Sequence, residues 1–263
     1  GSPRYRETAL ATGNFIRRDK MFRRRNWTGT HREPGWALVN LSRLYWFSGD
    51  PRFLKSAEIL AGIVIEQADG HGVRFDRLAK HNAPDTPHDT TEQDKQYLTG
   101  ALSFPTGYQT MGMMAIYKIT ADPELKTQIR ENILQCAAYV KQRLYFPKRR
   151  GFVHSPVPWR PQSTRNGGNS GSALRNVLWM DALLTGNAES RSIAEDTNRQ
   201  MLVRREIFAS PLKDTNPDYP AAKDICSAIY FLPETLEMMD TLQVVIPPFQ
   251  TDTDNRYIGL DKN

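Results

Sequence analysis

The chain has 263 residues, of which 39% are hydrophobic, 10% aromatic and 24% charged. This composition is sufficient for a sizeable core and excludes a collagen, a disordered tail and a disulfide-rich miniprotein. Apolar runs such as residues 60–65 are short, whereas a membrane-spanning helix needs about 20 apolar residues. We therefore predict a single domain over residues 1–263 without membrane insertion, in which residues 1–2 resemble a cloning scar and residues 244–263 form an extended tail.

Lysine and arginine outnumber aspartate and glutamate by 35 to 29, which gives a formal net charge of +6. A basic excess suits an anionic partner, such as an acidic glycan, a nucleic acid or a membrane surface. The charge gathers in an N-terminal cluster and a second, shorter one, formed by Arg17, Arg18, Lys20, Arg23, Arg24, Arg25, Lys148, Arg149 and Arg150. Because no nucleic-acid-binding motif accompanies these clusters, solvated helix and loop surface is favoured over a dedicated binding patch.

An internal repeat organises the chain after a first helix predicted over residues 5–21. Its three copies begin at Gly35, Gly107 and Ser172, and each reaches a turn 14 residues later. Apolar residues recur at helical spacing, and the first two copies align as Leu41 with Met113, Leu44 with Ile116 and Tyr45 with Tyr117. The repeat therefore predicts a helix at the start of each copy.

Each copy also has the turn chemistry of an antiparallel helical hairpin. In the first copy, Gly49 can adopt the left-handed conformation that ends a helix, Asp50 can cap the next helix, and Pro51 suits its first position. In the second copy Asp122 and Pro123 take the same two roles. Second helices are predicted over residues 51–67, 123–144 and 188–205, and a last helix over 224–242 with a kink at Pro233. The predicted fold class is all-α, built from repeated antiparallel helical hairpins with little strand.

The connections between the predicted hairpins are long and share one end of the bundle. They cover residues 68–104, 145–170 and 206–221. Long loops on a rigid scaffold commonly carry binding and catalytic groups. All histidines and three tryptophans map to this long-loop end: His31, His71, His81, His88, His154, Trp27, Trp36 and Trp159. Two other tryptophans, Trp46 and Trp179, fall within helices and are expected in the core.

The two cysteines, Cys136 and Cys226, match no zinc or redox spacing. Both lie in apolar, helix-like stretches, where a free cysteine behaves as a small buried hydrophobe. A disulfide between them stays open, and so does the redox compartment.

The turn sequence Tyr45-Trp46-Phe47-Ser48-Gly49-Asp50-Pro51-Arg52-Phe53-Leu54 resembles that of the (α/α) toroid proteins. These proteins include six-hairpin glycosidases, polysaccharide lyases and sugar epimerases. The resemblance covers roughly residues 30–205 and concerns the fold. Because this chain shows fewer hairpins than a full toroid, it implies a partial or shortened toroid, either a reduced relative or part of a longer protein with further domains.

The resemblance implies a carbohydrate-active domain that acts on or binds a polysaccharide in a cleft at the long-loop end. The basic charge favours an anionic one. No cofactor and no metal are expected, and the superfamily suggests a secreted or periplasmic setting. Neither the sugar nor the choice between hydrolysis, elimination and binding follows from the resemblance.

The densest polar segment of the sequence, residues 28–36, opens the first predicted hairpin. Here Glu33 can act as a general acid or base, His31 as a proton shuttle, Arg32 as a carboxylate clamp and Trp36 as a sugar-stacking face. The alternative is structural, because Thr30 and Glu33 have the spacing of a helix capping box. Both interpretations stay open.

The equivalent position in the second copy is Tyr108, which either forms a second cleft wall and catalytic candidate or packs in the core. Within the longest loop, His81 and His88 stand near four carboxylates, Asp85, Asp89, Glu92 and Asp94. Such a group could bind a divalent metal or supply the paired carboxylates of a glycosidase, although its spacing matches no fixed metal motif. We name the two histidines as substrate-binding candidates. An ordinary polar loop is the alternative there.

A last group of candidates precedes the third hairpin, near a glycine-rich run that lacks the Walker and Rossmann patterns. It consists of His154 as a catalytic base and Trp159, Arg160, Arg165 and Asn166 as substrate ligands. A polysaccharide lyase needs such a base and a group that neutralises the uronate carboxylate. A flexible connector is the alternative.

Three hypotheses from different classes follow. The first is a carbohydrate-active toroid domain, either glycoside hydrolase or polysaccharide lyase, in which His31, Glu33, His154 and Trp159 converge on one groove. The second is a non-catalytic module that binds a glycan or a protein at the same end. The third, ranked last, is an αα-solenoid scaffold whose basic N-terminal segment binds nucleic acid.

Overall fold

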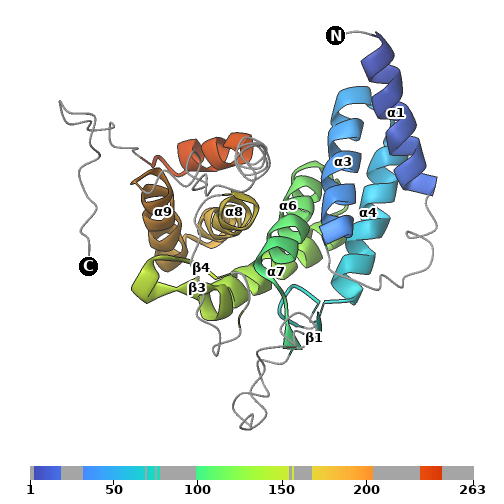
Figure 1. Ribbon diagram of the computed structural model, residues 1–263. Coiled ribbons are helices and arrows are strands. Elements are labelled where there is room, and N and C mark those ends of the chain that lie inside the picture. Colours follow the sequence, from blue (N-terminus) through green and yellow to red (C-terminus); the bar gives the residue numbers. More distant parts are fainter. Residues whose placement is uncertain are drawn as a thin grey trace, which may run out of the picture. The chain divides into compact units, whose positions relative to one another are not determined.

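In the computed structural model, the described residues are 3–18, 32–68, 70–74, 76–77, 99–153, 156, 168–203 and 232–244. Contacts between Cα atoms divide the chain into two units, residues 1–144 with 154–162, and residues 145–153 with 163–263. The first unit contains five α-helices among its described residues: α1 (Pro3–Arg18), α3 (Arg32–Ser48), α4 (Pro51–Glu66), α6 (Ser103–Ile119) and α7 (Pro123–Tyr139) (Figure 1). The second contains α8 (Gly168–Thr185), α9 (Ala188–Val203) and a helical stretch over residues 232–241.

Strand is confined to two short antiparallel pairs within the described residues. In the first unit, β1 (Asp76–Arg77) pairs with β2 (Thr99–Gly100). In the second, β3 (Tyr145–Phe146) pairs with β4 (Gly151–Phe152) across the 3₁₀ turn η4 (Pro147–Arg149). The all-α prediction is therefore confirmed, while the β3–β4 pair lies inside a segment predicted as a loop.

The predicted helices agree with the observed ones to within a few residues. The exception is the second helix of the second hairpin, predicted over 123–144, because α7 ends at Tyr139 and continues as the π-helical turn η3 (Val140–Leu144). Of the last predicted helix, residues 232–241 are helical, and the part before them lies outside the described residues.

The same hydrogen bond recurs in all three hairpin turns. A hydroxyl oxygen at the end of the first helix accepts a bond from the backbone N–H two residues later, at 3.2 Å each time; the pairs are Ser48 with Asp50, Thr120 with Asp122 and Thr185 with Asn187. This hydroxyl fixes the direction in which the chain leaves the first helix. The repeat seen in the sequence is therefore a structural repeat of its turns.

The predicted caps are confirmed. Asp50 accepts a bond from the Arg52 N–H at 3.0 Å, and Asp122 accepts bonds from the two N–H groups of Glu124 and Leu125 at 3.0 and 3.1 Å. Gly49 has a φ of 69°, in the left-handed region where glycine carries no steric penalty.

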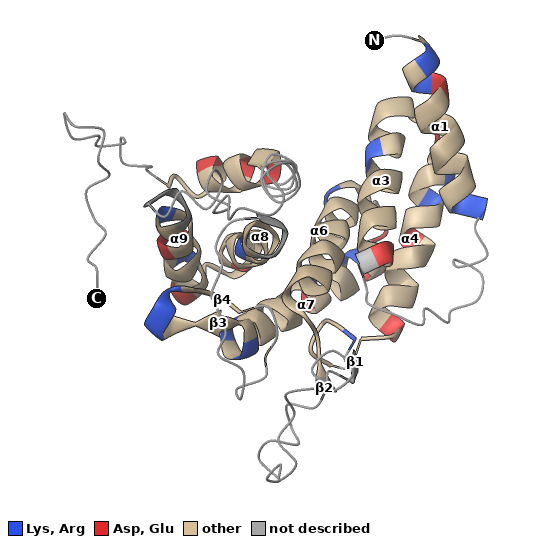
Figure 2. Ribbon diagram, viewed as in Figure 1, with Lys and Arg blue, Asp and Glu red and all other residues tan. Residues whose placement is uncertain are grey.

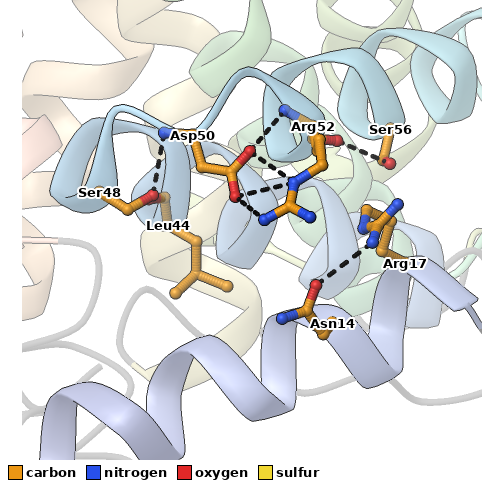
Figure 3. Close-up of polar contacts among 7 residues, drawn as sticks. All are labelled: Asn14, Arg17, Leu44, Ser48, Asp50, Arg52 and Ser56. Atoms are coloured by element: carbon orange, nitrogen blue, oxygen red, sulfur yellow. Dashed lines mark hydrogen bonds and ion pairs between the residues drawn. The ribbon is translucent and has the colours of Figure 1, made fainter.

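The first turn carries an additional ion pair. The Arg52 guanidinium bonds both carboxylate oxygens of Asp50 (Figure 3). The side-chain hydrogen bond from Arg52, followed by its backbone N–H, lowers the pKa of Asp50 to about 2. The Asp50 carboxylate therefore remains charged, and the cap intact, down to strongly acidic pH.

The first helices of the first two hairpins, α3 and α6, approach each other through glycines. A Cβ atom added to Gly35 would lie 2.5 Å from the backbone carbonyl of Tyr108 and 2.6 Å from the backbone nitrogen of Gln109. One added to Gly112 would lie 2.7 Å from the Cβ of Leu38 and 2.9 Å from the Gly35 oxygen. Only glycine permits this spacing, so the two residues form a seam, here called the glycine seam, between α3 and α6.

Apolar side chains on both sides of this seam form the core of the first unit. Its fully buried members include Leu38, Leu41, Phe53, Leu60, Met113, Ile116 and Ile133. In the second unit α8 is the central helix, because every residue from 171 to 182 is buried, including Trp179 as predicted. The prediction for Trp46 is wrong, since this side chain is 85% exposed at the last turn of α3.

The glycine seam gives a stability prediction. Alanine at Gly112 places a methyl group against Leu38 and the Gly35 oxygen, so the helices must separate. Overpacking of this kind costs about 1–3 kcal/mol, measured as the free energy of unfolding in urea.

Gly62→Ala is the matched control, because Gly62 also lies inside a helix but a Cβ there meets nothing within 4 Å. Alanine at that position should leave stability unchanged or raise it by about 0.5–1 kcal/mol. Equal effects of the two substitutions would contradict a close α3–α6 contact.

Candidate functional site

Two aromatic residues meet at the starts of α3 and α6, at the long-loop end of the first unit. The rings of Trp36 and Tyr108 lie with their centroids 4.6 Å apart and their planes tilted by 33°. Trp36 is partly exposed, whereas Tyr108 is 5% exposed. Because Gly35 packs on the backbone of Tyr108, the glycine seam itself sets the two rings against each other.

The aromatic pair resolves the alternatives for Tyr108 in part. Tyr108 packs in the core and at the same time supports the Trp36 ring, which keeps part of its surface open. An aromatic ring that packs on a second ring and stays partly exposed is suited to contact a flat apolar surface of a ligand.

A carboxylate stands beside the aromatic pair. Glu33 lies in the first turn of α3, is exposed, and precedes Trp36 by three residues. Residues three apart share one face of a helix, so Glu33 and Trp36 present a carboxylate and an indole on the same side. Arg32 begins α3, and its side chain lies outside the described residues, as does Thr30 of the proposed capping box.

Buried hydrogen bonds hold the start of the longest connection. The backbone oxygen of Gly72 accepts bonds from the side-chain amides of Gln109 at 2.6 Å and Asn132 at 3.0 Å. Gly72 has a φ of 71° and lies against the backbone of Cys136, where a larger residue has no room. The chain leaving α4 is therefore fixed to both α6 and α7.

The end of the same connection is held in a similar way. The Tyr139 hydroxyl donates to the Ala101 carbonyl and accepts from the Ala101 N–H, both at 2.8 Å. Burial raises the pKa of this hydroxyl to about 12, so it stays protonated at physiological pH. Between the two anchors β1 pairs with β2, so that Arg77 lies opposite Thr99.

One cysteine belongs to this buried layer. The Cys136 sulfur lies 2.8 Å from the Thr110 hydroxyl, and burial raises the pKa of the thiol to about 12. A thiol with so high a pKa forms almost no thiolate at neutral pH, so Cys136 is structural. The expectation of a buried hydrophobe is confirmed for Cys136, while Cys226 lies outside the described residues.

Most of the residues predicted for the site lie outside the described residues. These are His31, His81, His88, His154, Trp159, Arg160, Arg165 and Asn166. The convergence of His31, Glu33, His154 and Trp159 on one groove therefore stays a prediction. Of the five histidines, His71 is described; it is exposed, and its ring centroid is 6.1 Å from that of Tyr139.

Two further findings concern metals and membranes. Within the described ranges, His, Cys, Asp and Glu side chains form no group of three able to hold a metal ion. The helices that the structure describes also lack the combination of length and apolar composition that crossing a bilayer requires.

The second unit has a small polar pocket that the sequence did not indicate. It measures about 300 Å³ and lies between the β3–β4 pair and α9. Arg150, at the tip of the strand pair, contributes an ion pair with Asp196 at 3.6 Å, and burial raises the pKa of the adjacent Tyr145. Arg150, which belongs to the second basic cluster, therefore forms an ion pair within this unit.

Among solved structures, the chain is similar to a mannosidase of glycoside hydrolase family 76 from Bacteroides thetaiotaomicron, with a TM-score of 0.49 and 12% sequence identity. The similarity covers 82% of this chain and 57% of that enzyme, so the chain spans a little over half of its length. The likeness concerns the fold alone, as does the toroid resemblance of the turn sequence. No protein-family model matches the chain, and no curated protein matches it.

The Tyr139 anchor gives a prediction about the loop end. Tyr139→Phe removes the donor to the Ala101 carbonyl and leaves the Ala101 N–H without its bond, which should cost about 1–3 kcal/mol of unfolding free energy. Amide exchange at Ala101 should accelerate more than exchange in α7. Tyr117→Phe is the control, since the Tyr117 ring contacts Lys126 and phenylalanine retains that ring. If both variants exchange alike at Ala101, the anchor does not act as described.

Proposed function

We propose that the long-loop end of this chain binds a polysaccharide, with Trp36 as the stacking platform and Glu33 as the adjacent polar group. The observation that carries the proposal is the Trp36–Tyr108 pair, in which one ring is buried and fixes the other at an accessible position. Sugar rings have an apolar face surrounded by hydroxyl groups. A rigid indole next to a carboxylate complements both features.

The surroundings of the pair support a binding role. Both ends of the longest connection are fixed at Gly72 and Ala101, so the chain enters and leaves this connection at fixed points beside α6 and α7. Rigid elements that position loop residues are the usual architecture of binding sites. In this proposal His81 and His88, which belong to that connection, contact the ligand from the loop.

The net charge of +6 favours an anionic polysaccharide. Uronate carboxylates would pair with arginines of the long-loop end, and the candidates for this role remain Arg32, Arg160 and Arg165. Asn166 and Trp159 complete the proposed ligand set. An anionic ligand predicts that binding weakens as the ionic strength rises, since exposed charge pairs are screened by salt.

The test compares two tryptophans of the same helix. Trp36→Ala should weaken binding to the best polysaccharide of a mixed acidic and neutral panel by about tenfold, as measured by calorimetry or affinity electrophoresis. Trp46→Ala is the control, because Trp46 is an exposed tryptophan at the other end of α3. If Trp46→Ala reduces binding and Trp36→Ala does not, the proposed site is contradicted.

Turnover assays on the same panel then separate catalysis from binding. Reducing ends that disappear in Glu33→Gln would identify a glycoside hydrolase with Glu33 as its acid or base. Unsaturated-uronate absorbance that disappears in His154→Ala would identify a lyase. Binding without either product would identify a non-catalytic glycan-binding module, and no binding to any polysaccharide would contradict the proposal.

A further inference from the structure

A second surface, distinct from the long-loop site, lies between α1 and α3. It is a groove of about 880 Å³, here called the α1–α3 groove. Tyr5, Ala9 and Ile16 line it from α1, and Leu44 and Phe47 line it from α3. Two large aromatic side chains of the groove are exposed to solvent, Tyr5 at 79% and Phe47 at 59%. The groove lies between two helices of 16 and 17 residues, so its shape suits the docking of another helix.

The repeat shows what occupies the equivalent face of the next hairpin. Positions 40, 43 and 47 of α3 correspond to Gly112, Ala115 and Ile119 of α6, at the 72-residue offset between Gly35 and Gly107. On α6, Gly112 packs against Leu38 of α3. The α3 helix therefore covers the Gly112 part of this face of α6, while Ala115 and Ile119 are partly exposed; on α3 the same face lines the α1–α3 groove.

The residues at these positions determine the kind of helix that fits. In α3 they are Asn40 and Arg43 in place of a glycine and an alanine, so the close approach seen at Gly112 is not possible. Arg6 adds a second positive charge from α1 and lies 5.9 Å from the centre of the Phe47 ring. None of the described residues that line the groove is acidic.

The basic character extends beyond the groove itself. Figure 2 shows basic residues near both ends of α1, and its last turn contains Arg17 and Arg18. Glu7 is the acidic residue of this helix, two positions from Tyr5 and Ala9, and residues two apart do not share a helix face. Positive charge thus borders the apolar groove. A helix packed permanently over the groove would remove these arginines from water, which costs free energy.

We propose that the α1–α3 groove docks an amphipathic α-helix of a partner protein, whose apolar face contacts Phe47 and Leu44 and whose acidic residues pair with Arg6. The apolar contacts supply the affinity, and the charges select an acidic partner over a basic one. This interaction goes beyond the proposed glycan binding and uses a different surface of the same unit.

The test uses a pair of synthetic helical peptides of about 18 residues, close to the lengths of α1 and α3. Both carry the same leucine stripe; one has glutamates beside it and the other lysines. Fluorescence anisotropy should show binding of the acidic peptide and at least about tenfold weaker binding of the basic one. The variant Arg6→Glu should remove this preference.

Two further variants locate the binding surface. Phe47→Ser should weaken the acidic peptide by about tenfold, since it removes the largest exposed side chain of the groove on α3. Phe15→Ser is the control, because Phe15 is 70% exposed on α1 and does not line the groove. Circular dichroism confirms that each variant is folded.

Several results would overturn the proposal. They are equal binding of both peptides, failure of the folded wild-type chain to bind the acidic peptide, and loss of binding in Phe15→Ser as large as in Phe47→Ser. A concentration-dependent dimer that Phe47→Ser abolishes in sedimentation would assign the groove to a second copy of the chain. Because Trp36→Ala leaves the groove intact, failure here and failure of glycan binding are distinguishable.

Discussion

The close approach of α3 and α6 is the constraint on which the first unit depends. Glycine at positions 35 and 112 lets backbone meet backbone, and a methyl group at either position has no room. The same contact sets Trp36 against Tyr108, because the backbone of Tyr108 lies directly against Gly35. The aromatic pair is thus a consequence of helix packing, and any function assigned to it depends on the two glycines.

The polar contacts at the two ends of the hairpins have different roles. At the turn end, a repeated hydroxyl bond and a capping oxygen reverse the chain in a few residues, as at Ser48 and Asp50. At the opposite end, Gly72 and Ala101 are held by side chains of α6 and α7, so a long connection departs from fixed points. Short turns at one end and anchored loops at the other are the reason that we propose the long-loop end for ligand recognition. The α1–α3 groove adds a lateral surface with a different chemistry.

The sequence predicted the features that arise from local chemistry. Helix bounds, the caps at Asp50 and Asp122 and the left-handed Gly49 follow from residues a few positions apart. The glycine seam was not predicted, because it depends on which two helices pack together. Trp46 was assigned to the core from its mid-helix place, although three consecutive aromatic residues advance about 100° each around a helix and cannot share one face. Of the candidate site, the alignment of Trp36 with Tyr108 did indicate a common location, while the loop candidates depend on long-range placement that periodicity does not encode.

The central claim is that Gly35 and Gly112 act on one and the same contact, and a double-mutant cycle tests it most directly. The free energy of unfolding is measured for Gly35→Ala, Gly112→Ala and the double variant. If α3 and α6 meet along one seam, the first substitution separates the helices and relieves the second, so the double variant should lose less stability than the two single losses combined, by about 0.5–3 kcal/mol. Strict additivity would contradict the account, since it would mean that the two glycines respond to independent constraints.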